Sequence, residues 1–165
     1  MEVLWSALMY WATPTSEQRR YNMQVLVAYE SRGGRTRRAA EAVADAVRIC
    51  GSEATVKTLK DTTAEDVDRS DAIAIGCWVE GFVFFKVGPA RAALALLERL
   101  PALGGKPAAV FCTYAFNPHT TLATLRKSLE TKGAKVVAQN ASPRSHPDRG
   151  ATDLAEHICA SLKKF

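Results

Sequence analysis

Short apolar runs alternate along the chain with segments whose apolar residues recur at a helical spacing. Four of the five apolar runs are almost uninterrupted, as in strands covered on both faces, whereas ATVKTL alternates with polar residues as an edge strand can. The five predicted strands are VLVAY (25–29), ATVKTL (54–59), AIAIGC (72–77), AAVFC (108–112) and KVVAQ (135–139).

The segments between these runs predict helices. In the first, apolar residues from Ala40 to Val47 follow the spacing of one buried face, and Gly51 suits the position just after the helix. A short acidic piece, TAEDVDR (63–69), predicts a turn or two of helix. Three further helices are predicted, one beginning at Gly88-Pro89 with proline in its first turn, one capped at Asn117-Pro118, and one running through Leu154, Ile158 and Leu162.

Strands that alternate with helices predict a parallel sheet covered on both faces. The expected fold is therefore a three-layer α/β/α sandwich with a five-stranded parallel sheet in the order 2-1-3-4-5. Ligands of such sheets bind beyond the carboxyl ends of the strands, where the strand order reverses between strands 1 and 3. The loops that follow Tyr29, Cys77, Cys112 and Asn140 are therefore the places to look for a site.

Composition and charge limit the function further. The 165 residues are 47% hydrophobic and carry a net charge of +5, which suits one globular domain with a modest preference for anionic partners. Nucleic-acid binding is not expected, because no element interleaves basic and aromatic residues. The four cysteines form no CxxC pair, so reduced thiols in a cytoplasm are predicted and no metal site is expected. Cys77 and Cys112 end neighbouring strands as buried small side chains.

Residues 1–22 are set apart as an N-terminal extension that need not belong to the biological chain, and residues 23–165 form the predicted domain. The apolar run of the extension is interrupted by Ser6 and preceded by no basic region. It is too short to span a bilayer and poorly built as a signal peptide, so stable membrane association is not expected.

The loop after the first strand has the composition of an anion-binding turn. In SRGGRT (31–36), small residues allow successive backbone N–H groups to converge on an anion, and a helix start adds positive potential. Ser31 and Thr36 add hydroxyl donors, and Arg35 adds a charge. The turn lacks the GxGxxG and GxxxxGK[ST] patterns, so neither a dinucleotide fingerprint nor a nucleoside triphosphatase is predicted.

Two further loops place aromatic residues at the same end of the sheet. They are GCWVEGFVF (76–84), with Trp78, and CTYAFNPH (112–119), with Tyr114. Two aromatic loops beside a phosphate turn predict a slot for a flat ring that carries a phosphate. Stacking on such a ring contributes about 0.5–1.5 kcal/mol per aromatic beyond the buried area.

On these residues the chain from 23 to 165 resembles the flavodoxin family, in a short-chain form. Family members hold the phosphate of FMN in an [ST]-x-[ST]-G-x-[ST] loop, which Ser31, Gly34 and Thr36 match, and GCWVEG is similar to the Trp-x-x-Gly of the loop after strand 3. The resemblance implies FMN as cofactor, a flavodoxin-like sheet, and a backbone segment at 79–81 beside the flavin. The implied cofactor-binding residues are Ser31, Arg32, Gly33, Gly34, Arg35, Thr36, Cys77, Trp78, Val79, Glu80, Gly81, Thr113, Tyr114, Ala115 and Phe116.

The chain departs from the family pattern in two ways. Gly33 replaces the middle hydroxyl residue of the phosphate loop, which removes one donor worth about 1 kcal/mol. Glu80 is expected to lower the reduction potential of the flavin. The residues expected near the flavin edge are otherwise basic, where carrier flavodoxins are typically acidic, and they are Arg32, Arg35, Lys86, Arg144 and Arg149.

Three functions follow from the resemblance. The first is a redox carrier that passes electrons between a reductase and an acceptor protein. The second is an FMN-dependent NAD(P)H oxidoreductase acting on a quinone, flavin or similar small acceptor. The third is an interaction module that no longer binds flavin. The sequence favours the first narrowly and leaves the donor, acceptor and oligomeric state open; no catalytic residue is assigned.

Overall fold

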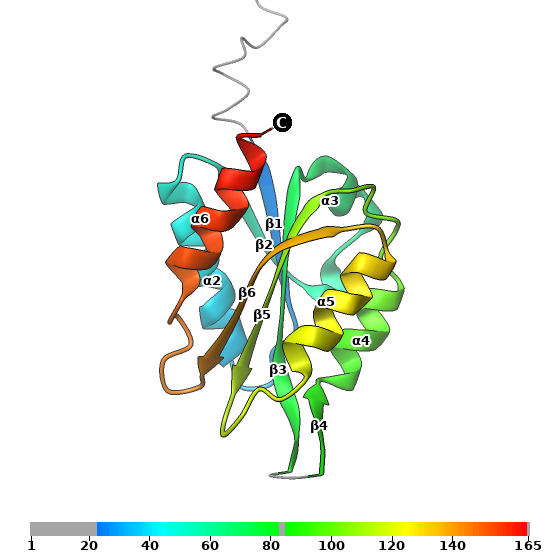
Figure 1. The fold of residues 1–165 in the computed structure, drawn as a ribbon, viewed down its shortest axis with the longest axis vertical. Helices are drawn as coiled ribbons and strands as arrows, with labels where there is room; N and C mark the ends of the chain where they lie inside the picture. The colour runs from blue at the N-terminus through cyan, green and yellow to red at the C-terminus, as the bar shows by residue number, and fades with distance from the viewer. Residues whose placement is uncertain (1–22, 83–84, 165) are drawn as a thin grey trace, which may run out of the picture.

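In the computed structural model, the described residues, 23–82 and 85–164, form a six-stranded sheet between two layers of helices (Figure 1). The predicted extension, residues 1–22, lies outside these residues. The strands are β1 (Gln24–Tyr29), β2 (Glu53–Thr58), β3 (Ala72–Phe82), β4 (Phe85–Pro89), β5 (Pro107–Tyr114) and β6 (Lys135–Pro143). The helices are α2 (Arg35–Ile49), the 3-10 turn η2 (Leu59–Asp61), α3 (Ala64–Arg69), α4 (Arg91–Glu98), α5 (Thr121–Thr131) and α6 (Ala151–Leu162).

The order of the parallel strands confirms the prediction. The sheet runs β2-β1-β3-β5-β6, which is 2-1-3-4-5 once the antiparallel strand β4 is set aside. β1 pairs with β3 in the register Val25↔Ala72 to Tyr29↔Gly76, so β1 ends beside Gly76 and β3 continues beyond it in the same direction. The carboxyl ends of these strands therefore share one edge, which lies at the bottom of Figure 1.

Helices cover both faces of the sheet, as the apolar strands require. α2 and α6 pack on one face (Figure 1), where Val43, Leu154 and Ile158 are buried among alanines of the strands. α4 and α5 pack on the other face, where Leu97, Leu125 and Leu129 are buried. Each helix thus buries the apolar stripe that its sequence spacing indicates.

The short elements also follow the sequence. Gly51 adopts φ +89° directly after α2, a conformation that glycine reaches without steric cost. The acidic piece forms α3, and Thr63 and Asp66 close a reciprocal capping box at its start.

One segment differs from the prediction. Pro89 was expected in the first turn of a helix, and this is wrong: it ends β4 opposite Val79, and α4 begins at Arg91. The segment after Cys77 was expected to be a loop, but β3 continues to Phe82 and pairs with β4. Gly81, at φ +124°, lies at the irregularity between Glu80 and Phe82 and permits this bend.

Asn117 also lies in a different setting from the one expected. The helix after β5 is capped at Thr120 and begins at Thr121. The Asn117 side chain instead accepts a hydrogen bond from the backbone N–H of His119 at 2.8 Å. Asparagine therefore closes a turn before the helix, a role that its short amide favours.

Candidate functional site

The turn after β1 delivers a helix N-terminus to the carboxyl edge of the sheet. The backbone N–H of Glu30 donates to the carbonyl of Gly76 at 2.9 Å, which anchors the turn to β3. Gly34 adopts φ +76° as the N-cap of α2, and no side chain caps the helix. The first turn also contains no acidic residue, so its backbone N–H groups are left for an anion.

Two hydroxyl groups of this turn are buried. The Oγ of Ser31 has no hydrogen-bond partner among the residues that the structure describes. The Oγ1 of Thr36 lies 2.8 Å from the Oγ1 of Thr113 at the end of β5, and either atom can be the donor. A buried hydroxyl without a partner is costly, so Ser31 is a candidate to bind a ligand oxygen.

Aromatic side chains border the turn on the neighbouring strands. Trp78 and Thr113 form the last pair between β3 and β5, and Tyr114 follows at the end of β5, so the two aromatic residues lie near each other on adjacent strands. A cavity of about 440 Å³ opens between them and the turn. Its lining residues are Ser31, Arg32, Gly33, Arg35, Thr36, Trp78, Val79, Thr113, Tyr114, Ala115 and Arg144.

Three arginines belong to this cavity. The Arg32 guanidinium lies 5.9 Å from the centroid of the Trp78 ring, which is a cation–π distance. Arg35 folds back over the turn, and its Nη1 lies 3.5 Å from the position that a Cβ would take at Gly33. The backbone N–H of Arg144 donates to the carbonyl of Tyr114 at 2.8 Å, which fixes the loop after β6 beside the cavity.

The structure brings most of the predicted site residues to the cavity and leaves others outside its lining. Gly34 and Gly81 shape the backbone nearby, and Phe116 is 78% exposed. Glu80 turns toward α4, where its carboxylate accepts a hydrogen bond from the Arg91 backbone N–H at 2.9 Å. The sequence analysis expected Arg144 near the flavin edge but did not include it among the binding residues. Its position directly after the last strand could have indicated that it lines the cavity.

Cys77 and Cys112 lie side by side in register on β3 and β5, and both are fully buried, as predicted. Burial raises the pKa of each thiol to about 12. Both therefore stay protonated at neutral pH, and neither is a thiolate nucleophile.

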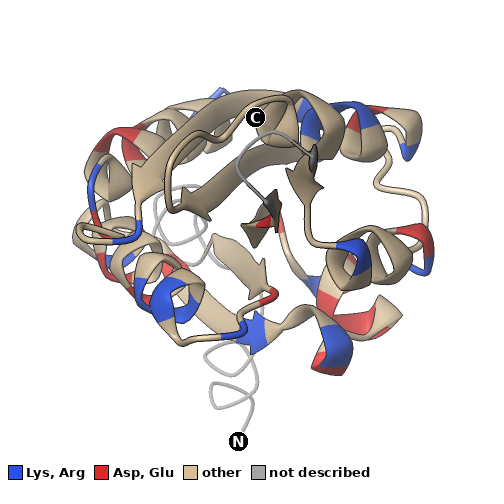
Figure 2. Ribbon diagram, turned by 90° about the horizontal axis from the view of Figure 1, so that it is seen from below, with Lys and Arg blue, Asp and Glu red and all other residues tan. Residues whose placement is uncertain are grey.

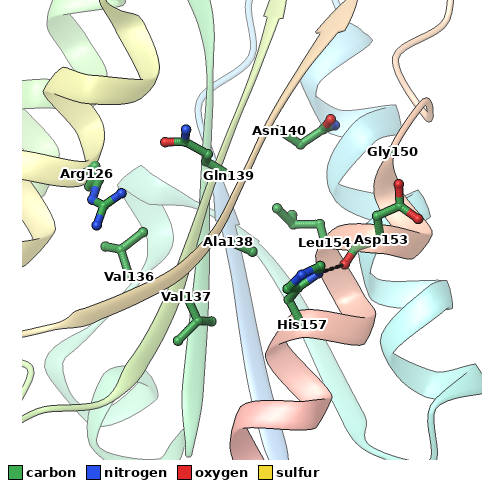
Figure 3. Close-up of a pocket in the computed structure, with 10 residues that line it drawn as sticks. All are labelled: Arg126, Val136, Val137, Ala138, Gln139, Asn140, Gly150, Asp153, Leu154 and His157. Carbon is green, nitrogen blue, oxygen red and sulfur yellow. Dashed lines mark hydrogen bonds between the residues drawn. The ribbon is translucent and has the colours of Figure 1, made fainter.

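A second cavity, of about 310 Å³, lies along the edge strand β6 between α5 and α6 (Figure 3). Figure 3 shows Arg126, Gln139, Asn140 and Asp153 around it. The Nδ1 of His157 is bonded to the Asp153 carbonyl at 2.7 Å, a contact within one helix. No Phe, Tyr or Trp is among its described lining residues, and it lies apart from the turn after β1. The cavity at the carboxyl edge is therefore the candidate site.

Comparison with known proteins agrees with this geometry. The model of the flavodoxin domain matches residues 26–155. The chain belongs to the flavodoxin family. Membership of this family implies an FMN-binding electron-transfer protein, as the sequence resemblance predicted. No match to this flavodoxin was found among curated proteins.

Solved structures show the same fold. A flavodoxin from the domain Archaea is 20% identical, with a TM-score of 0.71 over 86% of this chain and 99% of its own. The two-electron reduced flavodoxin of Megasphaera elsdenii is 22% identical, with a TM-score of 0.67 over 82% of this chain and 98% of its own. The rubredoxin oxygen:oxidoreductase of Desulfovibrio gigas is 16% identical, with a TM-score of 0.67 over 86% of this chain and 36% of its own.

The site residues fit FMN. The unpartnered Ser31 hydroxyl and the uncapped start of α2 suit a phosphate, and Trp78 and Tyr114 suit the faces of a flat ring. In residues 23–82 and 85–164, no group of three or more His, Cys, Asp or Glu side chains is placed to hold a metal ion. No helix in the same ranges is long and apolar enough to cross a membrane.

Proposed function

We propose that this flavodoxin binds FMN in the cavity at the carboxyl edge and carries electrons between a reductase and an acceptor protein. The observation that carries the proposal is the cavity itself, whose lining combines the turn at the uncapped start of α2 with two aromatic residues, Trp78 and Tyr114. FMN, when bound, supplies the redox chemistry, and the protein binds and orients it.

The turn at 31–36 holds the phosphate. Ser31 donates its free hydroxyl, and the backbone N–H groups at the start of α2 converge on the same oxygens. When Thr113 donates the hydrogen bond that joins the two threonines, the Thr36 hydroxyl keeps its own proton for the phosphate. Thr113 thereby positions Thr36 from the neighbouring strand.

Arg35 replaces the donor that is lost at Gly33. Its guanidinium lies against Gly33, in the room that a hydroxyl side chain would use, so it stands beside the bound phosphate. A charge-assisted hydrogen bond is about twice as strong as a neutral one, so the exchange of a hydroxyl for Arg35 does not weaken the phosphate site.

Trp78 and Tyr114 hold the ring and exclude water from its faces. The backbone at 79–81, of which Val79 lines the cavity, would offer its peptide groups to the edge of a bound ring. Glu80 supports this segment indirectly, because its carboxylate fixes the segment to the start of α4.

A second candidate function is an FMN-dependent NAD(P)H oxidoreductase that reduces a quinone, a flavin or a similar small acceptor. The observation that favours it is the presence of Arg32 and Arg144 in the cavity wall, since arginines bind the phosphates of a dinucleotide. Steady oxidation of NADPH by the purified protein with a quinone present would select this function over the carrier.

The test of the proposal is a titration of the FMN-free protein with FMN, followed by a visible spectrum during stepwise photoreduction. We expect one FMN per chain, quenched flavin fluorescence and yellow colour retained through gel filtration. Trp78→Leu should weaken both FMN and riboflavin about tenfold, while the wild-type protein should prefer FMN. A colourless protein that leaves FMN fluorescence unchanged would contradict the proposal and select an interaction module.

A further inference from the structure

The opening of the FMN cavity is basic, and none of its described lining residues carries a carboxylate. Arg32 lies in the loop after β1, Arg35 is the first residue of α2, and Arg144 lies in the loop after β6. Figure 2 views this end of the molecule and shows how basic and acidic residues are distributed over it. The chain as a whole carries a net charge of +5, so more distant residues do not cancel the positive potential.

The three arginines are not neutralised by ion pairs. The ion pairs formed within the described residues use Arg37, Arg48, Lys57, Arg69 and Arg126 with nearby carboxylates. Arg32, Arg35 and Arg144 belong to none of them, and all three are exposed. Their charge is therefore presented to whatever approaches the opening.

Two acidic residues adjoin the cavity lining in the sequence: Glu30 directly precedes Ser31, and Glu80 is turned away from the cavity. Glu80 follows Val79 on β3, but its carboxylate is hydrogen-bonded to the N-terminus of α4. That bond uses the positive end of the helix dipole, so part of the negative charge is compensated there. Arg91, whose N–H makes the bond, adds a further exposed cation beside the hairpin of β3 and β4.

From this arrangement we propose that the protein with which this flavodoxin exchanges electrons docks an acidic face on Arg32 and Arg144. The inference rests on the proposed function, since it concerns the partner of the bound FMN. Arg35 is assigned to the phosphate at the turn, which leaves the other two arginines for the partner. The Arg32 guanidinium also lies over the Trp78 ring, so its charge is placed directly beside the aromatic wall of the cavity.

An acidic protein fits better than a dinucleotide. Arg32 and Arg144 are exposed at the cavity on two different loops, and Arg91 adds a third exposed cation at the start of α4. Such a distribution steers a charged protein face and speeds its encounter, with a strong dependence on salt. The cavity of about 440 Å³ is itself assigned to FMN, so a dinucleotide would have to bind on the same exposed loops.

The first test measures the charge around Trp78 without FMN. The variant W5F/W11F leaves Trp78 as the single tryptophan of the chain. Its fluorescence is quenched with iodide and, separately, with caesium at low and high ionic strength. We expect iodide to quench more strongly than caesium at low salt, and the ratio to approach one at high salt. A stronger effect of caesium would overturn the proposal.

Charge-removing variants locate the effect. In the single-tryptophan background, Arg32→Gln and Arg144→Gln should each lower the iodide-to-caesium ratio about twofold. Lys135→Gln removes the same charge at the start of β6, a full strand length of about 30 Å from Arg144, and should leave the ratio unchanged. An equal effect of all three variants would mean that net charge alone is responsible, and would overturn the proposal.

The second test uses the FMN-loaded, reduced protein with two one-electron acceptors, ferricyanide and hexaammineruthenium(III). One electron leaves the reduced cofactor and converts Fe(III) to Fe(II) or Ru(III) to Ru(II). The rate with the anion should fall as salt rises and the rate with the cation should rise. Opposite slopes would overturn the proposal but leave FMN binding intact. Failure to bind FMN would instead refute the proposed function, while the quenching result still stands.

A nucleotide outcome is also distinguishable. The NADPH outcome requires that NADPH reduces the FMN-loaded protein and that Arg32→Gln or Arg144→Gln raises the KM for NADPH. If these variants also leave the salt dependence with ferricyanide unchanged, the arginines bind a dinucleotide. The acidic-partner proposal is then wrong.

Discussion

The hydroxyl oxygens of Thr36 and Thr113 lie 2.8 Å apart in a buried hydrogen bond that joins the first turn of α2 to the end of β5. The two residues are 77 positions apart, and Thr36 is 1% exposed. This bond fixes the start of α2, which we propose binds the phosphate, to the strand that carries Tyr114.

Removal of one partner should therefore be worse than removal of both. Thr113→Val leaves the Thr36 hydroxyl buried and unpaired, and should lower the free energy of unfolding by about 1–3 kcal/mol. The double variant T36V/T113V should lose less than the sum of the single variants, because no hydroxyl is left unpaired. Urea unfolding of the FMN-free chain measures this, and strictly additive losses would contradict it.

Arg35 and Gly33 should behave as a compensating pair. Arg35→Gln should weaken FMN about tenfold and leave riboflavin, which lacks the phosphate, unchanged. Gly33→Ser in that background should restore part of the affinity, since a Cβ at Gly33 meets only the Arg35 side chain. Arg38→Gln, on the same helix but outside the cavity lining, is the control. Flavin fluorescence quenching measures the Kd values, and equal losses for FMN and riboflavin would refute a phosphate contact.

Glu80 should act chiefly on stability. Glu80→Ala removes the acceptor for the Arg91 N–H and should lower the free energy of unfolding by about 1 kcal/mol. Glu80→Gln keeps an oxygen acceptor and should lose less than the alanine variant. The sequence-based expectation that Glu80 lowers the flavin reduction potential stays a prediction, and a potentiometric titration of Glu80→Gln tests it. Identical unfolding curves for Glu80→Ala and wild type would exclude the capping role.

Gly76 should tolerate no side chain. A Cβ there would lie 2.1 Å from ring atoms of Phe111, which is 2% exposed and cannot swing into solvent. Gly76→Ala should lower the free energy of unfolding by about 1–3 kcal/mol, and Phe111→Leu in the same chain should recover part of it. Gly88→Ala, where nothing lies within 4 Å of the new Cβ, is the matched control. Similar losses in both alanine variants would point to backbone effects instead.

The ion pair of Lys57 and Asp66 should give a stability that depends on acid pH. Two hydrogen bonds to the Asp66 carboxylate lower its pKa from 3.8 to about 2. The larger effect comes from the Lys57 side chain, and the next from the backbone N–H of Thr63. Because the folded pKa is the lower one, the stabilisation is present above pH 3.8 and is lost as the pH falls through 2. Asp66→Asn should lose about 1 kcal/mol at pH 7 after screening by solvent, and the gap to wild type should close between pH 4 and 2. A gap independent of pH would contradict the pairing.

The sequence predicted the parallel sheet well because its central strands β1, β3 and β5 are buried. Runs such as AIAIGC and AAVFC leave no polar face, which is typical of parallel strands covered by helices on both sides. The hairpin of β3 and β4 was not predicted, since Gly81 interrupts the run and Gly88-Pro89 has the composition of a helix start. This segment is extended because the end of β3 pairs with β4, a strand only a few residues away. Such a short hairpin leaves little periodic pattern in the sequence.

The site was predicted to the level of its loops rather than its contacts. Ser31, Thr36, Trp78 and Tyr114 line one cavity, because the ends of parallel strands converge, and their contact with FMN stays a prediction. The side-chain direction of Glu80 was beyond the sequence, since it depends on the continuation of β3 and on the position of α4. The fold-back of Arg35 over Gly33 likewise depends on the conformation of the turn.

The length of β3 bears on how a ring is received. β3 is paired with β5 as far as Trp78 and with β4 from Val79 onward. The backbone on both sides of Trp78 is therefore held by neighbouring strands. Ordering the backbone of one residue costs about 1–2 kcal/mol in conformational entropy. Around Trp78 this ordering takes place on folding and not when a ring binds. A ring that binds beside Trp78 therefore meets a backbone that is already ordered.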